Sequence, residues 1–305
     1  MFSKQRNRSS LLGALIALML LLTNVSAAAA SAKSAASSCD QVVRFESNEF
    51  THPIKINNKW MPLVPGTQFI FEGRINQRGG PVAVPHQVVF TVTDLTKVIN
   101  GVRTVVLWDR DFDNGQLVEA ELAFFAQDKG GNVWNLGEYP EEYTDGVFEG
   151  APNTWIVGEA GAKAGIHMFA NPKVGSPSYL QGSTPKIAFL DCGQVADNGQ
   201  TEDVPFGHYE NALVTHEWSP LEPDSGIQVK YYAPGVGNFQ IGAVGDPEAE
   251  TLVLIDLKIL SPDALAEARN EALILDSRAY EVSKVYRKTS PAEHHSHDDD
   301  DGDSD

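Results

Sequence analysis

Three aspartates at alternate positions are the first feature of this chain that could do chemistry. Asp109, Asp111 and Asp113 lead directly into an Asn-Gly pair, and acidic side chains in a loop can converge on a hard cation such as calcium. The spacing departs from the EF-hand pattern, because the glycine stands at the seventh position of the segment and not at the sixth. If the segment is a loop, it predicts a calcium site to which Asp128 of the next turn adds a fourth ligand.

The same residues fit a β-hairpin, which we favour over the metal loop. Asn-Gly between β-forming residues is typical of a two-residue hairpin turn, and the resulting register pairs Arg110 with Glu119 across the two strands. On a regular strand the three aspartates share one face, with Cα atoms ~6.6 Å apart at each step. Calcium ligands must lie within ~2.5 Å of one ion, so a strand would separate these carboxylates.

A second candidate site combines acidic and aromatic residues. Glu138, Glu141 and Glu142 lie between Trp134 and Trp155. Sugar-binding sites use aromatic rings for stacking and carboxyl groups for acid–base chemistry, so the block predicts ligand contacts from the two tryptophans and the last two glutamates. An acidic surface loop with ordinary aromatic packing explains the same residues, and we favour that interpretation.

Within this block Glu138 is the best candidate for a general acid. It follows a glycine, which would let a ligand approach the backbone closely. A catalytic partner must come from a distant strand, and we assign His216 to this role, with Glu217 as the alternative. Adjacent residues of a strand point to opposite faces, which argues against His216 and Glu217 acting together.

No other compact catalytic or metal-binding motif occurs in the sequence. Five histidines precede the C-terminal tail, and none belongs to an H-x-H or H-E-x-x-H motif. Nucleophilic-serine, P-loop and dinucleotide-binding glycine motifs are missing too. The sequence therefore favours a binding protein over an enzyme.

The first 27 residues predict export. Lys4, Arg6 and Arg8 precede an apolar run of 12 residues, 11–22, and Val-Ser-Ala at 25–27 provides a small-x-small cleavage site. These three parts form a secretory signal peptide. The apolar run is shorter than the ~20 residues needed to cross a bilayer, so we expect no transmembrane span. The protein should then be secreted, either to the periplasm or to the extracellular space.

Charge and cysteine content fit an exported protein. The formal net charge is −18, and such a surface repels nucleic acid and anionic membranes but tolerates cations. The two cysteines are Cys39 and Cys192, and an even number in an oxidising compartment favours a disulfide between them. We expect this bridge, and we expect a small molecule, a glycan or a cation as the partner.

The elements that must position these residues are mostly strands. Runs of β-forming residues alternate with Gly and Pro turns from about residue 60. A meander of antiparallel strands is expected from 67 to 136, and residues 139–200 are richer in turns. Later strands are expected at 187–190, 212–216, 228–232, 239–244 and 251–259. One helix is expected at 262–276, with Ser261 as its cap.

The chain divides into four predicted parts. Residues 1–27 form the signal peptide, and residues 28–38 form an Ala/Ser linker. A β-rich domain follows at 39–288, as an antiparallel barrel or sandwich with the C-terminal helix. The tail at 289–305 carries histidines and a run of aspartates, and we expect it to be disordered because it cannot bury enough apolar surface.

Three segments resemble sequences found in exported bacterial proteins. They are Asn-Lys-Trp-Met-Pro-Leu-Val-Pro-Gly-Thr at 58–67, Ala-Gln-Asp-Lys-Gly-Gly-Asn-Val-Trp at 126–134, and Lys-Tyr-Tyr-Ala-Pro-Gly-Val-Gly at 230–237. Together they resemble a largely uncharacterised family of exported β-rich proteins. The resemblance implies a secreted β domain and carries no activity with it.

Three functions are compatible with these observations. The leading hypothesis is a secreted acidic binding protein, stabilised by calcium if the aspartates form a loop. The first alternative is a secreted glycan-active hydrolase or lyase that uses paired carboxylates. The second alternative is a barrel-type carrier of an apolar ligand. The interior of the fold distinguishes them, because an enzyme needs a wet cleft with two carboxylates, a carrier needs an apolar cavity, and a surface binder has a filled core.

Overall fold

Side chains on the long strands alternate between two separate apolar cores. On β5 (Val102–Asp113), Val105 and Leu107 belong to one buried cluster, and Val106 and Trp108 belong to the other. The first cluster contains residues from strands all around the sheet, whereas the second contains residues of the helix. When the side chains on one face of a sheet all pack into a single core, the sheet closes into a barrel around that core. The helix covers part of the outside of this barrel.

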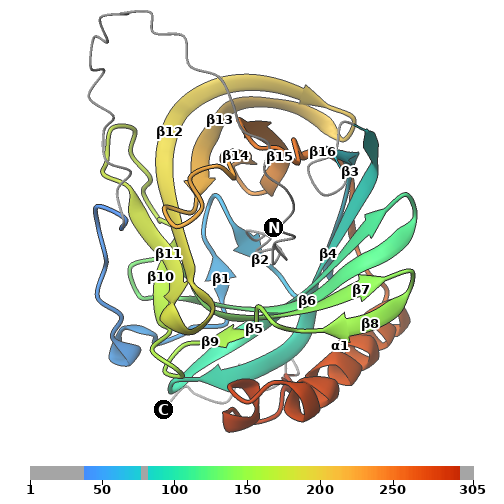
Figure 1. The fold of residues 1–305 in the computed structure, drawn as a ribbon. Helices are drawn as coiled ribbons and strands as arrows, with labels where there is room; N and C mark the ends of the chain where they lie inside the picture. Colours follow the sequence, from blue (N-terminus) through green and yellow to red (C-terminus); the bar gives the residue numbers. More distant parts are fainter. Residues whose placement is uncertain (1–37, 77–81, 296–305) are drawn as a thin grey trace, which may run out of the picture.

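The computed structural model describes residues 38–76 and 82–295 as a closed antiparallel β-barrel (Figure 1). Twelve strands of the described residues form the wall, in the order β3 to β7 and then β10 to β16. Pairing of β7 with β10 and of β16 with β3 closes the ring. The prediction of an antiparallel barrel or sandwich with one C-terminal helix is confirmed, and the barrel is the correct alternative.

Most strands are longer than their sequence patterns indicated, whereas β16 has the expected bounds, Thr251–Ile259. The wall strands other than β5 are β3 (Thr67–Asn76), β4 (Ala83–Ile99), β6 (Gln116–Gln127), β7 (Val133–Thr144), β10 (Lys163–Met168), β11 (Tyr179–Thr184), β12 (Phe189–Val204), β13 (Gly207–Trp218), β14 (Ile227–Ala233), β15 (Gly237–Val244) and β16 (Thr251–Ile259). The short strands are β1 (Ile56–Asn57), β2 (Pro62–Leu63), β8 (Val147–Gly150), β9 (Trp155–Ile156) and β17 (Glu293–His294). The region 139–200, expected to be rich in turns, holds the four strands β8 to β11 and parts of β7 and β12, and residues 185–187 form a 3-10 turn before β12.

The β5–β6 hairpin confirms the favoured interpretation of the aspartate segment. Asn114 and Gly115 have φ values of 51° and 77°, as a type I′ turn requires. The predicted pairing of Arg110 with Glu119 is wrong, because a bulge after Asp111 shifts the register by one residue. Glu119 therefore faces Asp111 across the ladder, and two acidic side chains lie on the same face.

One helix, α1 (Pro262–Val282), lies along the outside of the barrel (Figure 1). Its cap is Ser261 as predicted, with the side chain accepting a hydrogen bond from the backbone N–H of Ala264 at 3.3 Å. The helix continues two turns beyond the predicted end at 276. It packs against β4 and β6 with a buried stripe composed largely of alanines.

Part of the predicted C-terminal tail is ordered. After the short 3-10 helix at Tyr286–Lys288, residues 289–295 run along the barrel wall, and β17 pairs with β4. Ala292 donates its backbone N–H to Asp276 of the helix at 3.2 Å. The expectation of disorder was wrong for these residues because they find backbone and side-chain partners. Residues 296–305, like the signal peptide and residues 28–37, lie outside the described residues.

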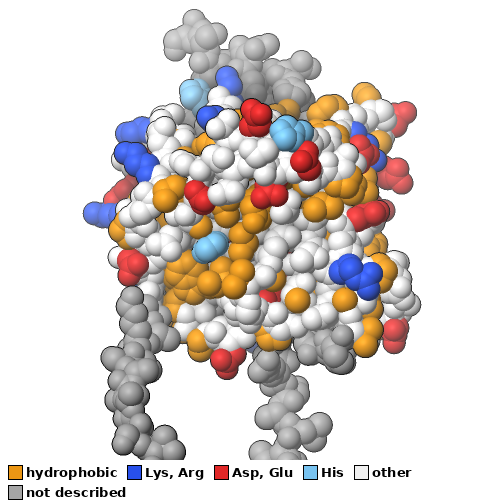
Figure 2. Space-filling view, turned by 90° about the horizontal axis from the view of Figure 1, so that it is seen from above, with side chains coloured by type: hydrophobic (Ala, Val, Ile, Leu, Met, Phe, Trp, Pro, Cys, Tyr) orange, Lys and Arg blue, Asp and Glu red, His pale blue; other side chains and the backbone are white. Residues whose placement is uncertain are grey.

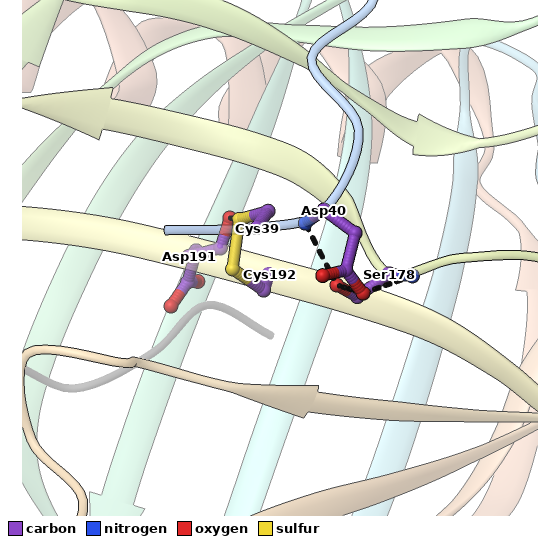
Figure 3. Close-up of a disulfide and its surroundings, with 5 residues drawn as sticks. All are labelled: Cys39, Asp40, Ser178, Asp191 and Cys192. Carbon is purple, nitrogen blue, oxygen red and sulfur yellow. Dashed lines mark hydrogen bonds between the residues drawn. A yellow bond between two sulfur atoms is a disulfide. The ribbon is translucent and has the colours of Figure 1, made fainter. Parts of the chain in front are cut away.

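The N-terminal segment is fastened to the wall by the predicted disulfide. Cys39 and Cys192 are bridged, with Cα atoms 5.5 Å apart (Figure 3). Next to the bridge, the Ser178 hydroxyl donates to the Asp40 carboxylate at 2.7 Å and accepts from the Asp40 backbone N–H at 3.0 Å. The chain then folds inwards, and the hairpin of β1 and β2 lies within the ring of strands (Figure 1), with Ile56 and Leu63 in the inner core.

Candidate functional site

Acidic side chains line one side of the barrel interior. Asp109, Asp111 and Asp113 continue the inward-facing register of Leu107 along β5, Glu121 lies opposite Asp109 on β6, and Glu138 follows on β7. All five are buried, with exposed fractions of 2% to 5%. We call these five residues the acidic strip. Strand pairing thus places together carboxylates that are up to 29 positions apart in the sequence.

The position of Glu138 depends on a bulge in β7. Between Asn135 and Glu138 this strand carries one residue more than its partner β6, so both side chains face inwards and Asn135 donates to Glu138 at 2.6 Å. Gly137 makes the bulge possible, because its φ is +151° and an added Cβ would lie 2.7 Å from the backbone oxygen of Trp155. The glycine therefore serves close packing of β9 on β7.

The carboxyl groups of Glu121 and Glu138 differ in their hydrogen-bond partners. Glu138 accepts hydrogen bonds from Asn135 and, at 2.9 Å, from Trp155, whereas Oε1 of Glu121 has no hydrogen-bond partner among the described residues. Burial raises the pKa of both groups. Glu138, Glu119 and Asp109 raise the pKa of Glu121 further, and it lies well above the ordinary value.

A second polar group lies on β10 to β14. Lys230 is 2% exposed and its ammonium is 2.5 Å from the Glu217 carboxylate, which also accepts a hydrogen bond from Gln181 at 3.2 Å. Burial alone would raise the pKa of Glu217, but Lys230 and His167 outweigh it and the pKa is lowered. Burial lowers the pKa of His167 to about 3, so its imidazole is neutral at pH 7.

A cavity inside the barrel is lined in part by His167 and Lys230 of the second polar group. It leaves about 60 Å³ accessible to the centre of a water-sized molecule, against the ~10–15 Å³ that one water requires. Its walls are mainly apolar. The lining includes Met61, Leu63, Phe69, Phe71, Phe90, Leu107, Tyr232 and Val236, together with His167, Lys230 and Asn238. Phe90 pairs directly with Asp109 on the neighbouring strand, so the apolar wall continues into the acidic strip.

The structure separates the residues of the predicted acid–aromatic block. Glu138 faces inwards, but Glu141 lies on the outer face, where it accepts hydrogen bonds from Tyr139 at 2.7 Å and from Tyr143 and Arg278 at 2.5 Å. Glu142 accepts a hydrogen bond from Asn153 at 2.9 Å. Glu141 is therefore enclosed between the barrel and α1 and does not contact the cavity.

The two tryptophans of that block have structural partners. Trp134 packs on Phe45 and Phe50 outside the barrel and donates its indole N–H to Asp128 at 2.8 Å. Trp155 is buried, stacks at 5.2 Å on Phe189 of β12 and donates to Glu138. Trp155 thus acts on the site through Glu138, and Trp134 does not reach it.

His216 and Glu138 lie on opposite faces of the barrel wall. Thr215 and Glu217 point inwards, so His216 between them points out. The predicted pairing of Glu138 with His216 is therefore wrong. Glu217 has the inward orientation, and the acid that interacts with Glu138 most directly is Glu121 on the neighbouring strand.

The four aspartates proposed as calcium ligands do not form one site. Asp109, Asp111 and Asp113 succeed one another along β5, while Asp128 holds its own turn through Asn132 and Trp134. Within residues 38–76 and 82–295, no group of three or more His, Cys, Asp or Glu side chains is arranged to hold a metal ion. Calcium binding stays a prediction without structural support.

Glu121, His167 and Lys230 were not predicted as site residues from the sequence. Glu121 sits in the apolar run of β6, where its period-two alternation with Glu119 was the available signal. His167 and Lys230 carry no motif, and only closure of the barrel brings them to the cavity. Figure 2 shows one face of the molecule, on which an apolar area lies among scattered acidic side chains.

Comparisons with known proteins yield distant similarity in fold. No protein-family profile matches the chain, and no curated protein matches it. Among solved structures, one from Bacteroides fragilis, described as an exported protein with a YmcC-like fold, is 14% identical, and the alignment covers 66% of this chain and 99% of that one with a TM-score of 0.38. Another, described as a lipoprotein from Parabacteroides distasonis, is 16% identical, with coverage of 65% and 97% and a TM-score of 0.28.

No helix of the described residues has the length and apolar character needed to cross a membrane.

Proposed function

We propose that this chain is an exported binding protein that holds a small molecule with an apolar body inside its barrel. The cavity between the β1–β2 hairpin and the wall carries this proposal, because Phe69, Phe71 and Phe90 face it together. Small-molecule sites combine apolar walls with a few polar groups that fix orientation. Export is supported by the N-terminal sequence pattern and by the disulfide, since such bridges persist in oxidising compartments.

The carrier function has more support than the glycan-active hydrolase. A glycan site needs carboxyl groups beside a wet cleft with exposed aromatic rings, whereas the carboxyls here are buried and the adjoining cavity is lined mainly by apolar side chains. Filling of the interior by a ligand also explains why a barrel of this size retains a cavity beside its inner hairpin.

Binding of a neutral apolar probe tests the proposal. We expect 1-octanol to bind the full chain in titration calorimetry. Val236 lies half-buried in the turn at the cavity, so Val236→Trp should block binding while the circular dichroism spectrum stays unchanged. Val147→Trp on the exposed strand β8 is the matched control and should bind normally. Equal binding by the unmodified chain and Val236→Trp, or no binding by either, would contradict the proposal.

A further inference from the structure

On the inner wall next to the cavity, acidic residues lie in the same cross-strand rows as the apolar residues that line the cavity. One row across β4, β5 and β6 reads Phe90, Asp109, Glu121, and the adjacent row across β5, β6 and β7 reads Leu107, Ala123, Glu138. Phe90 and Leu107 line the cavity. Asp109 lies next to Phe90 and Glu121 lies one strand further, so an occupant of the cavity that extends towards β6 passes Asp109 before it reaches the Glu121 carboxyl group.

Glu121 is a buried acid whose hydrogen-bonding capacity is not fully used by the described residues. It is 2% exposed, and its Oε1 has no partner among the described residues. A buried carboxylate without a partner is costly, and an unsatisfied buried polar group in a native protein calls for an explanation, such as a functional role. The neighbouring acids increase the free-energy cost of ionising Glu121, because Glu138, Glu119 and Asp109 repel its negative charge.

We propose that the ligand is an apolar organic cation, an ammonium or guanidinium compound, whose charged group rests on Glu121 and whose apolar body fills the cavity beside Phe90 and Leu107. This assignment rests on the proposed function and specifies its ligand class. An anion is disfavoured because Lys230, the ammonium at the cavity, is already 2.5 Å from Glu217. A bare metal ion is disfavoured because no metal-holding cluster exists in the described part of the chain.

Three probes of equal chain length separate charge from apolar contact. We expect the full chain to bind octylammonium at least about tenfold more tightly than 1-octanol at pH 7, and octanoate more weakly than either. Glu121→Gln should reduce octylammonium affinity to the level of 1-octanol and leave 1-octanol affinity unchanged. Glu72→Gln makes the same charge change at an exposed position of β3, and it should change neither affinity.

The pH dependence gives a second readout on the unmodified chain. Acids face Glu121 from β5 (Asp109), β6 (Glu119) and β7 (Glu138), and Lys230 acts on Glu138 from the opposite wall. Octylammonium affinity should rise with pH as the Glu121 carboxyl loses its proton, while 1-octanol affinity stays flat.

The outcomes distinguish the two proposals. Binding of 1-octanol with no preference for octylammonium and no effect of Glu121→Gln would overturn the cation site and leave the carrier function intact. Absence of binding by all three probes would overturn both. Displacement of octylammonium by millimolar calcium would overturn the assignment to an organic cation and favour a metal ion at the strip.

Discussion

Buried charged groups on the two faces of the barrel wall differ in whether they have hydrogen-bond partners. On the outer face, Lys97 donates to Asp276 at 2.9 Å, to the Tyr280 hydroxyl at 2.8 Å and to the backbone oxygen of Ser290 at 2.6 Å. All three donors of this ammonium are therefore used. On the inner face, one oxygen of the equally buried Glu121 has no partner among the described residues. The satisfied group stabilises the fold, and the unsatisfied group is available to a ligand.

The outer network matters because it joins helix α1 to the barrel wall by buried polar contacts. Its buried stripe includes Ala268, Ala272 and Ala279, and alanines remove little apolar surface from water. Asp276 and Arg278 supply polar anchors instead, the first to Lys97 and the second to Glu141. Arg269 adds a third polar contact, to Asp94 of β4 at 3.1 Å.

Removing an outer anchor should have the largest effect on stability. Asp276→Ala leaves the Lys97 ammonium buried without its counter-charge, and breaking such a pair costs about 3–5 kcal/mol. The free energy of unfolding from urea titration measures this loss. Glu267→Ala on the exposed face of the same helix is the control and should cost far less. Equal losses in the free energy of unfolding for the two variants would show that the Lys97–Asp276 pair does not stabilise the fold.

The disulfide is the covalent fastening of the outer wall. Cys192→Ala releases a loop whose ends are separated by 153 positions, and loss of such a bridge costs about 2–5 kcal/mol. Thermal unfolding followed by circular dichroism should show a lower Tm. An unchanged Tm, or two alkylatable thiols in the natively secreted protein, would refute the role of the bridge.

A milder change to the outer face should have an intermediate effect. Glu141→Gln keeps the size of the side chain but replaces charge-assisted hydrogen bonds from Tyr143 and Arg278, at a cost of about 1.5–3 kcal/mol. Urea titration tests this value. Glu149→Gln on exposed β8 is the control, and a loss no larger than that of the control would show that Glu141 does not fasten the helix.

The smallest effect, and one of opposite sign, is expected on the inner face. Glu121→Gln removes a buried carboxyl group, one oxygen of which has no hydrogen-bond partner among the described residues, so stability in the absence of ligand should be unchanged or rise by about 1 kcal/mol. The pKa of Glu121 is raised in the folded state, so the folded chain holds this proton more tightly than the unfolded chain. Stability from this group is therefore present at low pH and is lost as the pH rises through the folded pKa.

The difference in stability between the unmodified chain and Glu121→Gln isolates the Glu121 effect. His167, whose pKa burial lowers to about 3, acts in the opposite direction, because the unfolded chain gains its proton first as the pH falls below 6.5, and this contribution is common to both chains. The stability of the unmodified chain should fall relative to Glu121→Gln as the pH rises through the folded pKa of Glu121. A difference that stays constant with pH would show that folding does not raise the pKa of Glu121.

Local signals in the sequence were sufficient for the elements but not for the site. Asn-Gly at 114–115 predicted the β5–β6 hairpin, and Ser261 predicted the start of α1, because turns and caps depend on adjacent residues. The bulge after Asp111 changed the cross-strand partners without a signal of its own. One inserted residue reverses which side chains share a face, so assignments built on register, such as Arg110 with Glu119, did not hold.

The sequence by itself determined a mainly β chain with a disulfide and one C-terminal helix, since composition, alternation and cysteine number suffice for these. It also determined that Asp109, Asp111 and Asp113 share a face, because side chains on a strand repeat every second residue. Only the tertiary structure decided which face lies inside, since both faces of this wall are buried and apolar residues occur on each. Closure of the ring placed Glu121 and Lys230 in one interior and put Glu141 and His216 outside it. Such placement depends on pairing between strands that are distant in sequence, which no local pattern encodes.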